Sequence, residues 1–320
     1  MRPGSALRSR LCHAALLAAL LLPALPVAAQ HAPPGASRVE PRASRGEPRA
    51  RADRCYRPFA LRDRDIRRHA ARIAGHGRLC ITVQAGRDGP LSWRLTTIRH
   101  RDHPDGPVWA VLHDDEDAAF DTALAAVETW GGALVAVDTD EARTNDGLDP
   151  NRAFGDTVDQ VRGCANLGGR PAAAYTRAIL DHFPPGATIL ALHTNAPGHR
   201  ATGGLGDVSA AVTDGARQGF LTRHPQGALS DPDNVVLIPG ELPFAWNRAA
   251  QEAIRFFHAR GINAIYETVR RDHSDCSLSQ YATLVRGAPY YNIEVLDGRA
   301  ADQLVIVRTL MDWMGIAPAR

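Results

Sequence analysis

Three residues in this sequence have the types and spacing of metal ligands. His113 follows the apolar segment 108–112, and Glu116 comes three residues later. On the first turn of a helix, residues three positions apart point the same way, so the imidazole and the carboxylate can converge on one cation. His193 ends a second apolar segment, 187–192, and is the candidate third ligand. Two histidines and one glutamate leave the fourth position of a zinc ion open for water, as a catalytic site requires.

Glu294 is the candidate for acid–base chemistry at such a site. It lies in the segment YYNIEVL, residues 290–296, on the face opposite Tyr291, Ile293 and Val295. A carboxylate in a largely buried strand is costly unless it has a partner or a function. Taking a proton from water beside a metal ion is one such function.

Each of these residues also has a simpler interpretation. The four acids from Asp114 to Asp117 could complement a helix dipole, with no metal involved. A lone His193 is more often a hydrogen-bonded core histidine, and Glu294 could pair with one of the many arginines. His199, His273 and the acidic run remain alternative ligands. We favour the metal site because the simpler interpretations would all have to coincide in one ordered set.

The segment EARTNDGLDPNRAF, residues 141–154, lies between the candidate ligands. Its Asp-Pro-Asn stretch is a good turn by itself. The order HxxE after a strand, Arg, D-P-N-R-x-F, a strand ending in His and a late-strand Glu resembles the zinc carboxypeptidase family. The match runs from residue 108 to about residue 296. It is equally similar to the shorter deacylase branch of aspartoacylases and succinylglutamate desuccinylases.

The resemblance implies a role for each matched residue. His113, Glu116 and His193 would bind one zinc ion. Arg143 would polarise the scissile carbonyl, which agrees with the use of cations where negative charge develops. Asn151 and Arg152 would hold a substrate carboxylate, which a guanidinium can grip through two parallel bonds. Glu294 would be the general base and acid.

The sequence departs from the digestive members of that family. Nine positions separate Arg143 from Arg152, a shorter interval than in those enzymes. Tyr266 and Tyr281 are the candidates for the mobile tyrosine of those enzymes, although neither has a persuasive spacing. The specificity pocket is unassigned, and the segment 275–281 is a candidate lining.

Strand-like and helix-like segments alternate from Cys55 onward. Strands are predicted at 79–84, 91–98, 107–113, 133–138, 187–193, 234–239, 263–269 and 290–296, and helices at 117–130, 172–183, 249–260 and 302–314. This alternation predicts an α/β fold with a mixed, mostly parallel sheet flanked by helices on both faces. We predict one catalytic domain over residues 54–320.

The N-terminal segment predicts export. Residues 1–29 combine arginines, a short apolar run and a small-residue cleavage site, which is typical of a signal peptide, and residues 30–53 read as a flexible Pro- and Arg-rich linker. Cleavage would change the formal charge from +2 to about −1, which gives no global reason to bind nucleic acid. Cys12 precedes the apolar run, so we expect no membrane anchor after cleavage. The expected location is periplasmic or secreted.

Four cysteines remain after cleavage, and an even number in an exported chain favours disulfides. Three pairings are possible, and we predict Cys55–Cys80 and Cys164–Cys276.

Together these features predict an exported zinc metallohydrolase that cleaves an amide bond next to a free carboxylate. Cell-wall peptides are one candidate substrate. An N-acyl amino acid deacylase is an alternative, as is a non-catalytic protein that binds a carboxylated ligand on the same fold.

Overall fold

In the computed structural model, residues 55–164, 166–195, 208–224 and 227–319 are described, and they belong to one compact unit, Ala50–Arg320. The predicted signal peptide, the predicted linker and His199 lie outside the described residues. Within the described ranges, no helix has the length and apolar character needed to cross a membrane.

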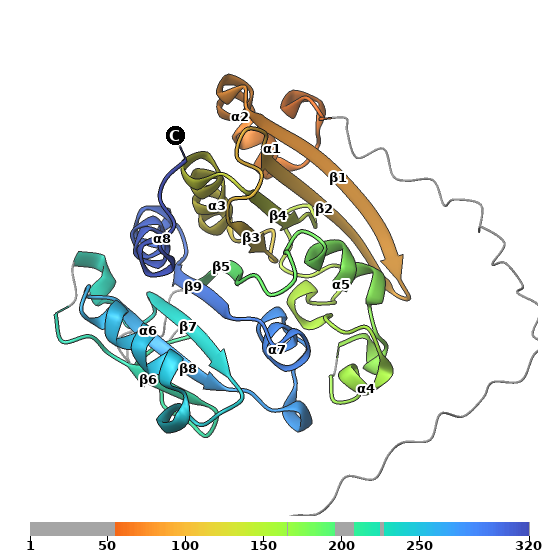
Figure 1. Ribbon diagram of the computed structural model, residues 1–320. Coiled ribbons are helices and arrows are strands. Elements are labelled where there is room, and N and C mark those ends of the chain that lie inside the picture. The colour runs from red at the N-terminus through yellow and green to blue at the C-terminus, as the bar shows by residue number, and fades with distance from the viewer. Residues whose placement is uncertain (1–54, 165, 196–207, 225–226, 320) are drawn as a thin grey trace, which may run out of the picture. The chain divides into compact units, whose positions relative to one another are not determined.

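The described strands form one sheet with the order β1-β2-β4-β3-β5-β9-β7-β8-β6 (Figure 1). Their bounds are β1 Leu79–Asp88, β2 Leu91–His100, β3 Val108–Val111, β4 Ala133–Val137, β5 Ile189–Asn195, β6 Arg217–Phe220, β7 Val235–Gly240, β8 Asn263–Thr268 and β9 Tyr290–Leu296. Strands β4, β3, β5 and β9 at the centre are parallel, and β7 is parallel to β8. The remaining pairs, including the β1–β2 hairpin, are antiparallel. The predicted mixed α/β sheet is confirmed.

Helices cover both faces of the sheet (Figure 1). Their bounds are α1 Arg64–Arg68, α2 Ala70–His76, α3 Asp117–Trp130, α4 Val158–Val161, α5 Ala173–Leu180, α6 Arg248–His258, α7 Leu278–Tyr281 and α8 Ala300–Met314. Helices α3, α6 and α8 pack in one hydrophobic core, and α5 and α7 pack in a second core on the opposite face. The prediction of helices on both faces of the sheet is therefore confirmed.

Two candidate site residues, His193 and Glu294, lie on the same face of the sheet. In β5, Leu190 and Leu192 enter the α3–α6–α8 core, whereas Ile189 and Ala191 enter the α5–α7 core. Because strand side chains alternate between faces, His193 shares the α5–α7 face. His193 is the register partner of Glu294 in the parallel pair β5–β9, so both side chains leave the sheet on this face.

The loop after α3 explains how that helix ends where the sequence predicts. Gly131 and Gly132 both have positive φ, +76° and +77°, which glycine adopts without strain. A Cβ atom on Gly132 would also lie 1.8 Å from the carbonyl oxygen of Pro107. The chain can therefore turn sharply into β4 only with glycine at this position.

Both predicted disulfides are confirmed. Cys55 pairs with Cys80 at the start of β1, and Cys164 pairs with Cys276, 112 positions away in sequence. The second disulfide joins the segment after α4 to the loop before α7.

Candidate metal centre

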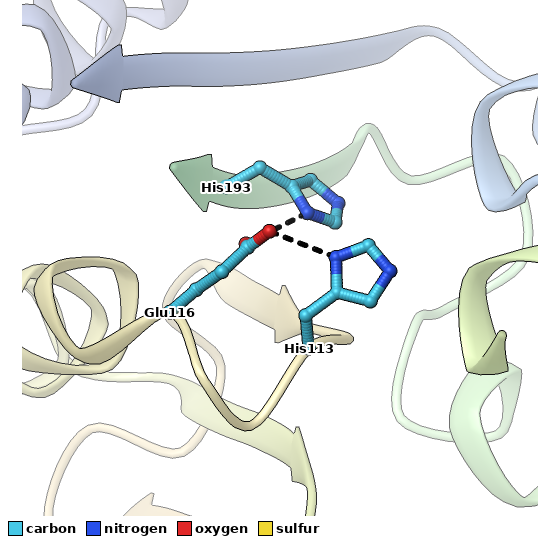
Figure 2. Close-up of side chains that lie close together, drawn as sticks. All are labelled: His113, Glu116 and His193. Atoms are coloured by element: carbon cyan, nitrogen blue, oxygen red, sulfur yellow. Dashed lines mark hydrogen bonds and ion pairs between the residues drawn. The ribbon is translucent and has the colours of Figure 1, made fainter. Parts of the chain in front are cut away.

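His113, Glu116 and His193 form a buried group of metal-ligand type (Figure 2). Each offers one ligand atom, and these atoms all lie within 4.8 Å of one another. The three side chains are 3% exposed each. The structure thus brings together the three residues that the sequence predicts as ligands, from two places in the chain.

The elements around the group position its members in a way that differs slightly from the prediction. β3 ends at Val111, so His113 lies in the loop that follows, and Glu116 is the N-cap residue of α3, not part of its first turn. His193 is not the last residue of its strand, because β5 continues to Asn195. The extra pairing of β5 with β9 extends the strand beyond the apolar residues that defined it in the sequence.

The carboxylate of Glu116 contacts two imidazoles, one guanidinium and one backbone N–H. Its Oε1 lies 2.9 Å from His113 Nδ1 and accepts a 2.9 Å hydrogen bond from Arg143 Nη1. Its Oε2 lies 3.0 Å from His193 Nδ1 and accepts a 3.1 Å hydrogen bond from the backbone N–H of Thr194. Burial alone would raise the pKa of Glu116, but the positive charge and hydrogen bonds of the two histidines hold it below its usual value.

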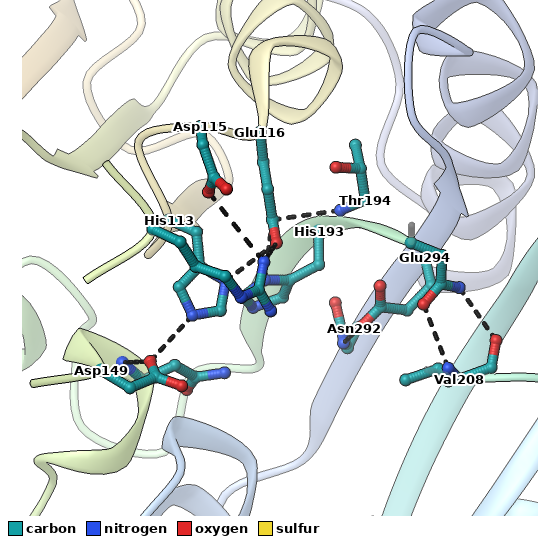
Figure 3. Close-up of polar contacts among 12 residues, drawn as sticks. His113, Asp115, Glu116, Asp149, His193, Thr194, Val208, Asn292 and Glu294 are labelled. Carbon is teal, nitrogen blue, oxygen red and sulfur yellow. Dashed lines mark hydrogen bonds and ion pairs between the residues drawn. The ribbon is translucent and has the colours of Figure 1, made fainter. Parts of the chain in front are cut away.

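Asp149 orients the first histidine from its other side. Asp149 Oδ1 lies 2.9 Å from His113 Nε2, and the same oxygen accepts a hydrogen bond from the backbone N–H of Asn151 (Figure 3). Burial would lower the pKa of His113, but the contacts with Asp149 and Glu116 raise it to about 9. From the sequence alone, Asp149 is predicted only as a turn residue. Its position in the Asp-Pro-Asn-Arg stretch, beside the candidate substrate-binding residues Asn151 and Arg152, could have indicated a role at the site.

The donor set fits a divalent metal ion of the zinc type. Two imidazoles and one carboxylate are a common zinc ligand set, and the Nδ1 atoms of both histidines face the Glu116 carboxylate. With His113 Nε2 donating to Asp149, its Nδ1 lone pair is available for a cation, as in carboxylate–histidine–metal sites. A metal ion in this group would be held by His113, Glu116 and His193.

A cavity of about 430 Å³ lies on the same face of the sheet. It is lined by Glu294, Asn292 and Tyr290 of β9, together with Glu267 of β8. Asn151 and Arg152 line it from the short 3₁₀ helix Pro150–Arg152. Loop residues Asp275, Ser277 and Ser279 complete part of the wall. Three predicted site residues, Asn151, Arg152 and Glu294, thus share one cavity.

Two hydrogen bonds hold the Pro150–Arg152 turn against the cavity. The backbone N–H of Leu278 donates to Asn151 Oδ1 at 3.1 Å, and the hydroxyl of Tyr175 donates to the carbonyl of Pro150 at 3.1 Å. Arg152 contacts its neighbour Asn151 through the backbone carbonyl and lies 3.4 Å from Asp275. The sequence gives no sign that Asp275 lies beside Arg152.

Glu294 is buried in the cavity wall. It is 7% exposed, and burial raises its pKa. Asn292 donates a 2.8 Å hydrogen bond from Nδ2 to Glu294 Oε1 (Figure 3). A raised pKa suits a carboxyl group that must accept a proton and later release it.

The acids beside His113 have separate contacts. Asp114 accepts hydrogen bonds from the backbone N–H groups of Thr139 and Glu141, so it anchors the loop that leads to Arg143. Asp117 is the acid in the first turn of α3, as expected from the helix-start interpretation.

Neither candidate tyrosine lines the cavity that contains Glu294. Tyr266 is buried and its hydroxyl contacts Asn247 and Leu242, whereas Tyr281 is hydrogen-bonded to Asp156. His273, an alternative ligand, is not part of the metal group.

Comparisons with known proteins give distant structural likenesses. No known family profile matches the sequence, and no curated protein sequence matches it. Among solved structures, a proposed metallopeptidase from Shewanella amazonensis SB2B is 13% identical, with a TM-score of 0.41, over 80% of this chain and 93% of that chain. A metallo-carboxypeptidase from Burkholderia cenocepacia is also 13% identical, with a TM-score of 0.41, over 78% of this chain and 69% of that chain.

Proposed function

We propose that this protein is an exported zinc-dependent hydrolase that cleaves an amide or peptide bond next to a free carboxylate. The observation that carries the proposal is the buried His113–Glu116–His193 group on the same sheet face as Glu294 and the Arg152 cavity. Zinc bound there supplies the Lewis acidity that polarises a carbonyl and makes water more acidic.

The protein's own groups would perform the remaining steps. Arg152 and the side-chain amide of Asn151 hold the substrate carboxylate at the cavity wall. Arg143, which is about half exposed beside the metal group, stabilises the negative charge that develops on the carbonyl oxygen. Glu294 takes the proton from the attacking water and transfers it to the leaving nitrogen. Arg143 thus acts on the carbonyl oxygen of the cleaved amide, and Glu294 acts on its nitrogen.

The charges in the cavity favour a substrate that also carries a cation. Arg152 lies 3.4 Å from Asp275, and Arg217 lies 3.3 Å from Asp214. Among the described residues, no hydrogen bond or ion pair reaches the carboxylate of Glu267, whose pKa burial raises to about 7. Glu267 is partly buried, and the charges of Arg217 and Arg152 only partly offset its raised pKa, so a cationic ligand group would stabilise its carboxylate. We therefore propose a substrate with a terminal carboxylate and an amino or guanidino group, as in a diamino acid of a cell-wall peptide.

Peptide digestion tests the proposed function. Purified protein loaded with zinc is incubated with a library of peptides with free C-termini, with muropeptides and with N-acyl amino acids, and the products are identified by mass spectrometry. We expect release of terminal residues from peptides, and loss of activity by at least about a thousandfold in Glu294→Gln, because the general base is removed. Cleavage of acyl amino acids alone would favour a deacylase. No cleavage of any substrate would favour a binding protein.

A further inference from the structure

Asn292 contacts the proposed general base while one of its own polar atoms has no partner. It lies two residues before Glu294 in β9, so both side chains leave the same face of the strand. Its Nδ2 donates to Glu294 Oε1 at 2.8 Å, and its side chain is 7% exposed (Figure 3). Its Oδ1 is a buried atom without a hydrogen-bond partner among the residues that the structure describes.

The orientation of the Asn292 amide is fixed by charge. In the ionised form that a general base requires, turning the amide over would place Oδ1 against the Glu294 carboxylate, and two acceptors would then face each other. The donor must therefore point at Glu294, which leaves Oδ1 as an acceptor in a residue that lines the cavity. A buried acceptor without a donor is destabilising, and such atoms are rare in folded proteins.

We propose that Asn292 positions Glu294 for proton transfer and accepts a hydrogen bond from the N–H of the bond to be cleaved. The second part rests on the proposed function. Because Oδ1 can only accept, its ligand must be a donor, and the scissile amide supplies one N–H, on the same nitrogen that Glu294 protonates. Because Asn292 would contact both the Glu294 carboxyl group and the leaving nitrogen, it would fix the position of one relative to the other.

The test compares Asn292→Leu with wild type on two substrates that differ at one atom. One is a peptide cleaved by the wild-type enzyme, and the other is its ester analogue with oxygen in place of the scissile N–H. We expect kcat/KM to fall about tenfold to a hundredfold on the peptide, and less on the ester, which has no N–H to lose. An equal loss on both substrates would overturn the contact with the N–H.

A double-mutant cycle separates positioning from a general loss of structure. Measured on the ester, which lacks the N–H, Asn292→Leu in the Glu294→Gln background should lower the residual activity little, because the carboxylate that it holds is absent. The full loss in both backgrounds would overturn the positioning role. Asn263→Leu is the matched control, because Asn263 is another buried sheet asparagine with side-chain hydrogen bonds but does not line the cavity. It should lower the melting temperature and leave the peptide-to-ester ratio unchanged.

Crystal structures of the metal-free wild type and Asn292→Leu provide a readout that needs no activity. The Glu294 carboxylate should keep one position in wild type and leave it in the variant. If the Glu294 carboxylate has the same position in both structures, the positioning role is wrong, whether or not wild type cleaves a substrate. A wild-type protein that cleaves no substrate would contradict the proposed hydrolase function, not the positioning role.

Discussion

The pairing of His113 with Asp149 links the turn of the Asp-Pro-Asn-Arg segment to the metal group. One carboxylate oxygen of Asp149 accepts from the backbone N–H of Asn151 and contacts His113 Nε2. A carboxylate in this place fixes the ring orientation and the tautomer that a metal ligand needs. His113 could be predicted as a candidate ligand from its spacing to Glu116, whereas Asp149 could not, because it lies in a common turn motif.

Replacing Asp149 by alanine should therefore weaken zinc binding without removing a ligand. We expect the zinc affinity to fall about tenfold to a hundredfold, measured by competition with a chromophoric chelator. Asp159→Ala is the control, because Asp159 is an exposed residue that pairs with Arg162 and lies outside the metal group. Equal zinc affinity in wild type and Asp149→Ala would show that Asp149 does not support the metal ligand.

Glu267→Gln should change substrate preference. If Glu267 pairs with a substrate cation, the ratio of kcat/KM for lysine-terminated over leucine-terminated peptides should fall about tenfold. Total activity on the leucine-terminated peptide should change little, because the residue is not placed at the reacting bond. Glu241→Gln, an exposed glutamate after β7, serves as the control. An unchanged ratio in Glu267→Gln would contradict the cationic substrate.

At the scale of elements, long periodic segments were predictable and short irregular ones were not. Helix α3 shows a clear apolar face that ends at two glycines, and the sequence predicts its bounds. The edge strand β6, with the pattern Arg-Gln-Gly-Phe, has no strand-like alternation and was missed. It exists because β8 offers an open edge with which it pairs in antiparallel register. Tertiary pairing of this kind leaves little signal in a four-residue segment.

The disulfide Cys164–Cys276 lies next to the cavity loop and should affect substrate binding. A variant with both cysteines changed to serine frees Asp275 and Ser277, which line the cavity. Loop-closure entropy for this long separation predicts a loss of about 4 to 5 kcal/mol in the free energy of unfolding. We expect KM to rise as well. Removing Cys55–Cys80, at the start of β1, should lower stability and leave KM unchanged. Equal effects of both changes on KM would contradict this account.

The packing of α5 against β2 predicts a loss of stability in acid. His182 follows α5 and lies 3.4 Å from both Thr97 and Arg99 of β2. Burial and the charge of Arg99 lower its pKa to about 4, below the usual value of 6.5. The unfolded chain therefore binds the proton first, and the stabilisation present above pH 6.5 is lost as the pH falls towards 4.

Urea unfolding from pH 7 to pH 4 checks this expectation. His182→Gln should show a smaller decrease in the free energy of unfolding than wild type, and the exposed His273→Gln should behave as wild type. An identical pH dependence in wild type and His182→Gln would show that this histidine does not cause the decrease.

At the scale of the whole molecule, the site is assembled from segments far apart in sequence. The candidate metal ligands come from the β3–α3 junction and from β5, and β8, β9 and loop residues contribute to the cavity. The ligand set could be predicted because each member sits at or near a strand end. The charged residues of the cavity could not be predicted. Glu267 and Asp275 lie beside the same cavity as Arg152 because of the order of the strands in the sheet, which the sequence does not reveal.

Because a metal ion would connect these segments, zinc should stabilise the fold. A free ligand at about a thousand times its dissociation constant contributes about 4 kcal/mol to the free energy of unfolding. Chelation should therefore lower the melting temperature of wild type, measured by calorimetry, and re-addition of zinc should restore it. In His113→Ala the chelator should have little effect. A melting temperature that does not respond to zinc in wild type would argue against a site within the fold.

A calorimetric titration of metal-free protein with zinc tests the central claim most directly. The buried group of His113, Glu116 and His193 predicts one zinc ion per chain in wild type, and loss of that binding in His193→Ala with the fold retained. Absence of tight zinc binding in folded wild type, or unchanged binding in His193→Ala, would contradict the metal centre and the hydrolase built on it.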